Sequence, residues 1–225
     1  MNRRLLANIF SLLPLAAGLA ALCFAPELIP TGFDAAGEPD EWGSRWTLLL
    51  WPLLVLLIRL TLIGLGKLVS LDKDGSRLAA YMDAVSFAVT AFFALLALYK
   101  LAVPLLPGLD MSRAGRDARI MQFAAALLGI LFIAAKDEVG AIPYNKNVGL
   151  KTKYTLAGED AWRAAHVFLG RALAAAGGCT VVLAVFLPGV WSLAAAAAAC
   201  VLAAVSAAAY ARRKVQPPPL ERSAK

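Results

Sequence analysis

Charged residues are scarce in this chain of 225 residues. Asp, Glu, Lys and Arg make up only 16% of it, whereas an ordinary soluble domain has about 25%, and 60% of the residues are hydrophobic. A soluble fold of this length could not cover so much apolar surface, because soluble helices are apolar on one face and not all round. The shortage of charge therefore argues against an ordinary soluble domain and indicates that lipid surrounds most of the chain.

Cysteine and histidine are also rare. The three cysteines, Cys23, Cys179 and Cys200, lie inside apolar segments, and the sequence contains no CxxC pair. This pattern argues against an extracellular disulfide framework and against a zinc site of the usual spacing. We interpret the cysteines as small apolar residues that face lipid or another helix. We expect neither a metal nor a cofactor.

Sequence motifs of soluble enzymes are missing as well. There is no phosphate-binding loop, no HExxH and no nucleophile elbow. An enzyme inside the membrane would need a nucleophile or paired acids at depth, and the charged residues expected there are Arg59 and Asp83. We therefore expect a protein that is not an enzyme. The net charge of +7 does not indicate a nucleic acid partner, because Lys and Arg stand at the ends of apolar runs.

What the chain does contain is six apolar runs long enough to cross a hydrocarbon layer of about 30 Å. They cover roughly residues 5–24, 46–66, 81–103, 119–135, 162–187 and 191–211. The fourth is the weakest, because its uncharged part spans only residues 120–135 and includes Gln122. The first is longer than the apolar part of a usual signal peptide, so we expect a retained helix. The sequence predicts an all-α polytopic membrane helix bundle with six transmembrane helices.

The distribution of Lys and Arg predicts the orientation of this bundle. Four lie in the connections expected on one side of the membrane, namely Arg45, Arg113, Arg116 and Arg119. Fifteen lie on the other side: Arg3, Arg4, Lys67, Lys73, Arg77, Lys136, Lys146, Lys151, Lys153, Arg163, Arg212, Arg213, Lys214, Arg222 and Lys225. Positive residues stay preferentially in the cytoplasm, so we expect both termini there.

The same runs suggest three regions along the chain. Residues 1–80 would form an N-terminal two-helix region with an acidic extracytoplasmic loop, and residues 81–211 a four-helix region. Residues 212–225 contain three consecutive prolines and are predicted to form a disordered cytoplasmic tail.

The first loop expected outside the cytoplasm, residues 25–45, has a more distinctive composition than a simple connection needs. Its prolines and glycines fix turns, and its acids and one aromatic residue are candidates for recognition: Asp34, Glu38, Asp40, Glu41 and Trp42. One interpretation is a solvated acidic loop with an aromatic belt at the interface. The other is an external surface that recognises a cationic or amphipathic peptide.

The second unusual loop covers residues 142–156 and is followed by Trp162, His166 and Gly170. These three residues recur at i, i+4 and i+8, which places them on one face of a helix. His166 could handle protons or bind a ligand, because histidine changes charge near neutral pH. Alternatively, it could be a structural histidine that bonds to a neighbouring loop.

Residues of the second loop and of the helix after it resemble a known family of bacterial membrane proteins, the SdpI family. The shared motif residues are Asn145, Gly149, Leu150, Lys151, Thr152, Tyr154, Thr155, Leu156, Trp162, His166 and Gly170. Residues 29–44, with Gly37-Glu38-Pro39-Asp40 and Trp42-Gly43-Ser44, are similar to the domain of unknown function that often precedes it. Lys151, Tyr154 and Gly32 stand where these families more often have Arg, Trp and His, and lysine lacks the bidentate donor of arginine.

The resemblance implies a protein of the bacterial cytoplasmic membrane that gives immunity to, or signals in response to, a secreted antimicrobial peptide or envelope stress. Its partners would be membrane lipid, a toxin peptide outside and a regulatory protein in the cytoplasm. The alternative function is a small-solute or ion-coupled transporter, although the paired helix interruptions typical of carriers are not visible.

Three positively charged residues, Arg59, Lys100 and Arg171, are expected within helices. Lys100 and Arg171 are expected about one turn from helix ends, from where they can reach the interface. Arg59 lies eight residues before Lys67, or roughly 12 Å deeper at about 1.5 Å per residue. A charge at that depth needs a partner. The sequence predicts an intramembrane ion pair between Arg59 and Asp83.

Overall fold

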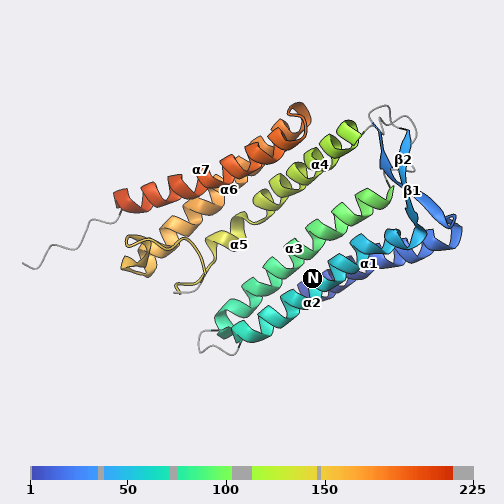
Figure 1. Ribbon diagram of the computed structural model, residues 1–225. Helices are drawn as coiled ribbons and strands as arrows, with labels where there is room; N and C mark the ends of the chain where they lie inside the picture. Colours follow the sequence, from blue (N-terminus) through green and yellow to red (C-terminus); the bar gives the residue numbers. More distant parts are fainter. Residues whose placement is uncertain (1, 35–37, 71–74, 103–112, 146–147, 215–225) are drawn as a thin grey trace, which may run out of the picture.

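The computed structural model describes residues 2–34, 38–70, 75–102, 113–145 and 148–214. Six of its helices are long and apolar enough to cross a membrane, which confirms the predicted all-α membrane helix bundle (Figure 1). They are α1 (Arg3–Phe24), α2 (Leu50–Ser70), α3 (Gly75–Ala102), α4 (Arg113–Ala134), α6 (Glu159–Phe186) and α7 (Val190–Lys214). Large apolar side chains such as Leu12, Leu57, Ile130 and Val205 are exposed on these helices, where lipid would cover them.

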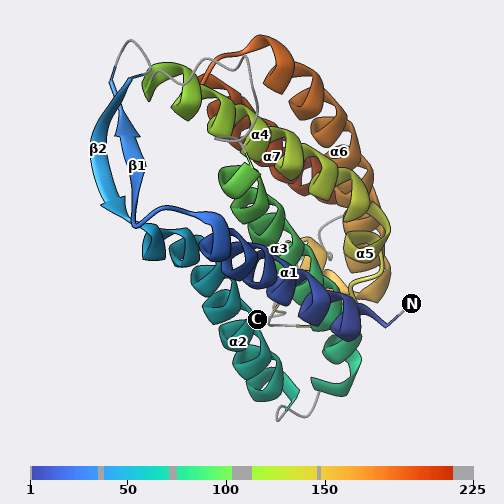
Figure 2. The ribbon, with the colours of Figure 1, turned by 90° about the vertical axis from the view of Figure 1, so that its right-hand side faces the viewer.

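The helices form two groups that lie side by side. α1, α2 and α3 pack together, and α4, α6 and α7 pack together with the short helix α5 (Lys136–Gly140) (Figures 1 and 2). The sequence assigned α3 to the C-terminal region, whereas in space α3 packs mainly against α1 and α2. The region boundary at residue 80 stays a prediction about the sequence, and the spatial division falls between α3 and α4.

Small residues allow the helices within each group to approach closely. The buried face of α1 consists of Ala7, Ser11, Pro14 and Gly18, which recur at helical spacing. In the second group, a Cβ atom on Gly129 of α4 would lie 2.7 Å from the carbonyl oxygen of Gly177 on α6. Without water to drive association, such close backbone packing holds membrane helices together.

The fourth helix is longer than its apolar run indicated. α4 begins at Arg113, six residues before the predicted start, and after Ala135 the chain continues as α5. Its one polar residue at depth is accommodated, because Gln122 Nε2 donates to the carbonyl oxygen of Leu187 at 3.1 Å. Leu187 follows the end of α6, where carbonyl groups lack helical partners. Gln122 therefore stabilises the α6–α7 turn from the neighbouring helix.

The ends of the other elements also differ from the sequence prediction. α7 continues to Lys214, three residues into the segment predicted as a tail, and residues 215–225 lie outside the described part. The loop after α1, which was predicted to lie outside the cytoplasm, contains an antiparallel hairpin of β1 (Leu28–Phe33) and β2 (Pro39–Ser44). The sequence did not predict this hairpin. A short 3-10 helix, η1 (Arg45–Leu49), connects the hairpin to α2.

Candidate functional site

Trp162 and His166 lie on α6 and hold the second unusual loop, residues 142–156, against this helix. Their side chains are 1% and 0% exposed, and their rings stack with centroids 4.1 Å apart. Trp162 Nε1 donates to the carbonyl oxygen of Ile142 at 2.9 Å, where the loop begins. Because both rings are buried, they fix the loop and are not available to dock a partner directly.

His166 joins the helix to the middle of the loop. Its Nε2 accepts a hydrogen bond from the backbone N–H of Leu150 at 3.0 Å, and its Nδ1 lies 2.9 Å from the carbonyl oxygen of Trp162. Nδ1 therefore carries the hydrogen, and the ring is in its neutral form in this arrangement. This is the contact expected of a structural histidine that bonds to a neighbouring loop.

Gly149 makes the approach of the loop possible. Its φ of +120° is one that residues with a side chain rarely adopt. A Cβ atom on Gly149 would also lie 2.5 Å from His166 Nε2 and 2.9 Å from the Trp162 ring. Both the backbone conformation and the space thus require glycine at this position.

The other motif residues close the loop on itself. Buried Thr155 donates to the carbonyl oxygen of Leu150 at 2.8 Å and accepts from the backbone N–H of Thr152 at 2.8 Å. Asn145 donates to the carbonyl oxygen of Pro143 and accepts from the N–H of Val148, both at 2.7 Å. The structure therefore brings together Asn145, Gly149, Thr152, Thr155, Trp162 and His166.

The remaining motif residues face outward or meet another element. Lys151 is exposed and Tyr154 is half-buried, with the Lys153 ammonium 5.1 Å from the Tyr154 ring centroid. Gly170 lies against α5, because a Cβ atom there would collide with the carbonyl group of Lys136. Gly170 therefore allows α5 to pack closely against α6.

A cavity of about 660 Å³ opens beside this loop, between α5 and α6. Its charged lining residues are Lys136, Asp137, Glu159, Arg163 and Arg171. Tyr144 and Trp162 form part of its wall. Such a mixed lining suits a charged, partly apolar group. Among the described residues, no three His, Cys, Asp or Glu side chains gather closely enough to hold a metal ion.

Arg171 differs from the sequence expectation. It lies twelve residues after the first residue of α6, not one turn from a helix end, and its side chain is exposed. Arg171 already lies nine residues after the predicted start of this helix at residue 162, so the expectation placed it too close to the helix end. Lys100, in contrast, lies in the last turn of α3 as expected, with its Nζ 4.4 Å from the centroid of the Trp51 ring.

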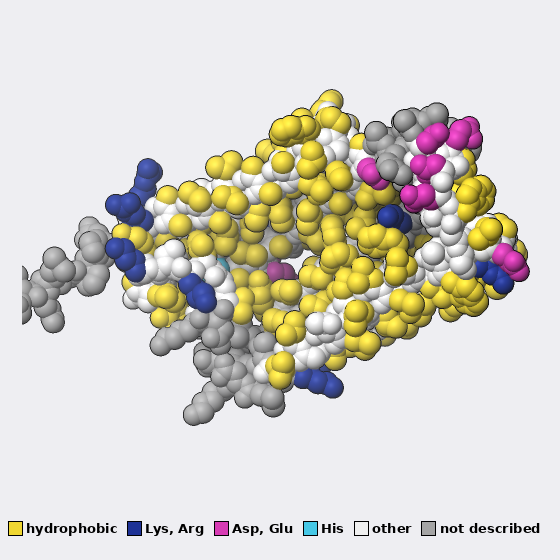
Figure 3. Space-filling view, viewed as in Figure 1, with side chains coloured by type: hydrophobic (Ala, Val, Ile, Leu, Met, Phe, Trp, Pro, Cys, Tyr) yellow, Lys and Arg dark blue, Asp and Glu magenta, His cyan; other side chains and the backbone are white. Residues whose placement is uncertain are grey.

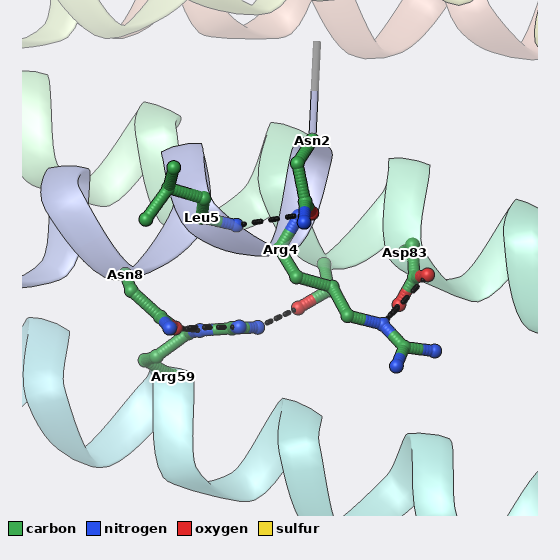
Figure 4. A network of polar contacts seen from close by, with 7 residues as sticks. Asn2, Arg4, Leu5, Asn8, Arg59 and Asp83 are labelled. Carbon is green, nitrogen blue, oxygen red and sulfur yellow. Dashed lines mark hydrogen bonds and ion pairs between the residues drawn. The ribbon is translucent and has the colours of Figure 1, made fainter.

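A polar network inside the first group of helices contains Arg59 (Figure 4). Arg59 is only 6% exposed, and Asn8 Oδ1 accepts from its Nε at 3.0 Å and from its Nη2 at 2.8 Å. Ser86 Oγ accepts from its Nη1 at 2.5 Å. Three helices thus meet at one guanidinium group.

This network does not contain the predicted direct ion pair between Arg59 and Asp83. Both carboxylate oxygens of Asp83 accept from Arg4 Nε at 2.8 Å (Figure 4). Arg4 reaches Asp83 because α1 packs against α3, which brings the first turn of α1 to the same level. From the sequence alone, Arg4 was only one of the positive charges that predict the orientation of the chain. One signal in the sequence could have indicated this role: Arg4 directly precedes the apolar run 5–24, so its side chain can reach a partner inside the bundle.

The acidic residues of the first loop gather at one end of the molecule, over the β-hairpin (Figure 3). Trp42 is 59% exposed on β2, and Trp46, just after it, is 63% exposed. Asp34 shapes the turn, because its Oδ1 accepts from the backbone N–H of Glu38 at 2.9 Å. Asp40 and Glu41 lie on β2 opposite Gly32, where a Cβ atom would come within 2.8 Å of each. The five predicted recognition residues therefore lie on or beside one hairpin.

Comparisons with known proteins agree with this arrangement. Residues 9–56 match the domain of unknown function DUF1648, and residues 141–210 match the SdpI/YfhL protein family. The first match contains the β-hairpin, and the second contains the loop held by Trp162 and His166. No curated protein and no solved structure matches the chain significantly. The chain is thus a multi-pass membrane protein in which a region similar to the SdpI/YfhL family, residues 141–210, follows a region similar to DUF1648, residues 9–56.

Proposed function

We propose that this protein acts without catalysis in the bacterial cytoplasmic membrane, giving immunity to, or signalling in response to, a secreted cationic peptide. The observation that carries the proposal is the hairpin, which presents four acids, Asp34, Glu38, Asp40 and Glu41, beside an exposed Trp42. Opposite charge steers a cationic peptide to such a surface, and an exposed indole ring adds apolar contact. The match of residues 141–210 to the SdpI/YfhL family supports the same function.

The loop held by His166 would serve the cytoplasmic side of this function. Its buried Trp162 and His166 make it a fixed surface, from which Lys151 and Lys153 project. The adjoining cavity of about 660 Å³ offers a regulatory protein a place to insert a charged side chain. In this proposal, the hairpin meets the peptide and the loop meets the regulatory partner.

The hairpin is tested by binding to the full-length chain in neutral-lipid nanodiscs. The probe is a fluorescently labelled amphipathic Lys/Leu peptide, and the variant is Glu38→Gln, Asp40→Asn and Glu41→Gln together. We expect the apparent Kd to rise roughly tenfold, since exposed ion pairs contribute about 0.2–1 kcal/mol each. Raising the salt concentration should weaken binding to the unchanged chain more than binding to the variant.

The matched control removes three exposed acids at the opposite end of the molecule, by Asp137→Asn, Glu159→Gln and Asp160→Asn. It changes the net charge equally, so peptide binding should stay close to that of the unchanged chain. Equal binding by the hairpin variant and the control would contradict the proposal. Cells that express the unchanged chain yet gain no protection from the peptide would favour the alternative, a small-solute or ion-coupled transporter.

A further inference from the structure

Arg59 carries a positive charge near the middle of a membrane-spanning helix. It lies nine residues after the start of α2 and eleven before its end, or roughly 14 and 17 Å at about 1.5 Å per residue. With 6% of its surface exposed, it is buried among α1, α2 and α3. Ionised side chains at such depth are rare and mark functional sites by default.

The direct partners of Arg59 are neutral. Asn8 Oδ1 and Ser86 Oγ accept three of the five N–H groups of the guanidinium. In the described part of the chain no carboxylate forms an ion pair with Arg59, since Asp83 pairs with Arg4. The network therefore satisfies part of the hydrogen-bonding capacity of Arg59 but does not neutralise its charge at contact distance.

A cavity of about 360 Å³ adjoins this guanidinium. Its wall includes three cations, Arg4, Arg59 and Lys67, and one carboxylate, Asp83. Arg4 and Lys67 lie near the ends of α1 and α2 that are expected in the cytoplasm, whereas Arg59 lies deeper. The cavity thus runs from the cytoplasmic helix ends to a buried cation and has an excess of positive charge.

We infer that this cavity binds a small anion whose phosphate or carboxylate group lies against Arg59. An anion there would accept the remaining guanidinium N–H groups in charge-assisted hydrogen bonds, which are the strong ones in proteins. Planar guanidinium groups suit carboxylate and phosphate geometry. The volume is at the lower end of known ligand pockets, about 300–1,000 Å³, so the occupant is a small solute or the end of a lipid headgroup.

This site is separate from the hairpin and does not depend on the peptide hypothesis. The hairpin acids lie at the far end of α1, beyond Phe24, whereas the cavity meets α1 at Arg4 and Asn8. Loss of peptide binding in the hairpin variant and loss of anion binding in the cavity variants are therefore independent results.

The test uses the purified full-length chain in phosphatidylcholine nanodiscs. Inorganic phosphate and acetate are titrated in turn, with chloride at equal ionic strength as the reference, and thermal unfolding is followed. We expect phosphate, acetate or both to raise the Tm saturably. Arg59→Gln should weaken the apparent affinity at least roughly tenfold, because it removes the charge while keeping an amide donor.

A second pair of variants tests the cavity without touching Arg59. A Cβ atom at either Gly64 or Gly66 would meet no other atom within 4 Å, but Gly66 lines the cavity and Gly64 does not. Gly66→Leu should fill the cavity and abolish the shift in Tm, while Gly64→Leu should keep it. Both substitutions add the same apolar side chain to the same helix, so a general effect of leucine would appear in both.

The source of the anion is decided by a second titration. Nanodiscs that contain phosphatidylglycerol should stabilise the unchanged chain over Gly66→Leu if the occupant is a lipid headgroup, whereas soluble phosphate or acetate acts in phosphatidylcholine if it is a solute. Stabilisation that is equal in Gly64→Leu and Gly66→Leu would overturn the inference. So would an unchanged affinity in Arg59→Gln, or the absence of stabilisation by soluble anions and phosphatidylglycerol alike.

Discussion

Gly149 shows how one residue can determine the shape of the family motif. Its φ of +120° and its contact with both buried rings leave no space for a side chain. The motif placed Gly149 among the residues of interest, but a motif does not give the reason. The reason lies in the distance between the loop backbone and the stacked Trp162 and His166.

The substitution Gly149→Ala should therefore destabilise the loop. Left-handed backbone strain of about 1–2 kcal/mol and overpacking of about 1–3 kcal/mol both act against it, so we expect a loss of roughly 2–4 kcal/mol. Gly158→Ala is the matched control, because a Cβ atom there would meet nothing within 4 Å and its φ is extended. Thermal unfolding in detergent measures both. Equal stability of the two variants would show that the loop can move away from the rings.

The charged residues at depth illustrate how far residue-level reasoning reaches. The sequence predicted that Arg59 and Asp83 lie on adjoining helices near enough to pair, and both line one cavity. It did not show that Arg4 would pair with Asp83, because that depends on which helices pack together. Spacing along one helix is readable from a sequence, whereas proximity between helices requires the tertiary structure.

At the scale of elements, the contact between α4 and α6 depends on two glycines. Gly129 and Gly177 lie so close that a Cβ atom on either would collide with the carbonyl oxygen of the other. The next residue, Gly178, lies on the same helix, and a Cβ atom there would meet nothing within 4 Å. Two neighbouring positions therefore differ: Gly177 has no space for a side chain, whereas Gly178 does.

Alanine at these two positions should have effects of opposite sign. Gly177→Ala should lower the free energy of unfolding by about 1–3 kcal/mol through overpacking. Gly178→Ala should raise it by up to about 1 kcal/mol, because alanine favours the helix over glycine. The measurement is thermal unfolding followed by circular dichroism. If Gly178→Ala lost as much stability as Gly177→Ala, the close contact between α4 and α6 could not be the cause of the loss.

The elements differ in how well the sequence predicts them. Six apolar runs gave six helices, because run length against membrane thickness is a simple criterion. Helix ends were less clear, since α3, α4 and α6 extend past their apolar runs into polar sequence. The hairpin was missed because Pro30, Gly32 and Pro39 are disfavoured in strands and the register shifts beside Gly32.

At the scale of the whole molecule, charge divides between the two ends. The acidic hairpin lies at one end, and the basic end of α7 lies at the other (Figures 1 and 3). The fold is consistent with the predicted alternation of the helices, because an even number of crossings returns the chain to its starting side. The positive-inside rule predicts that the hairpin lies outside the cell.

Cysteine labelling in whole cells tests this assignment. The starting chain has Cys23, Cys179 and Cys200 replaced by alanine, because the first two are exposed and would react. In that background, Asp40→Cys should react with a membrane-impermeant maleimide from outside the cell. Lys151→Cys should react only after the membrane is opened. Labelling of both positions from the same side would disprove the six-crossing orientation.

α1 gives the molecule a mechanical link between its two ends. The helix runs from Arg3 to Phe24 without a break through Pro14, about 33 Å at about 1.5 Å per residue, and β1 starts four residues later. At its other end, Arg3 pairs with Glu138 of α5 and Arg4 with Asp83 of α3. Exposed ion pairs of this kind contribute only about 0–1 kcal/mol. Because a continuous α-helix is stiff along its axis, a displacement of the hairpin along this axis would also displace Arg3 and Arg4. It would thereby strain two weak ion pairs, one in each group of helices.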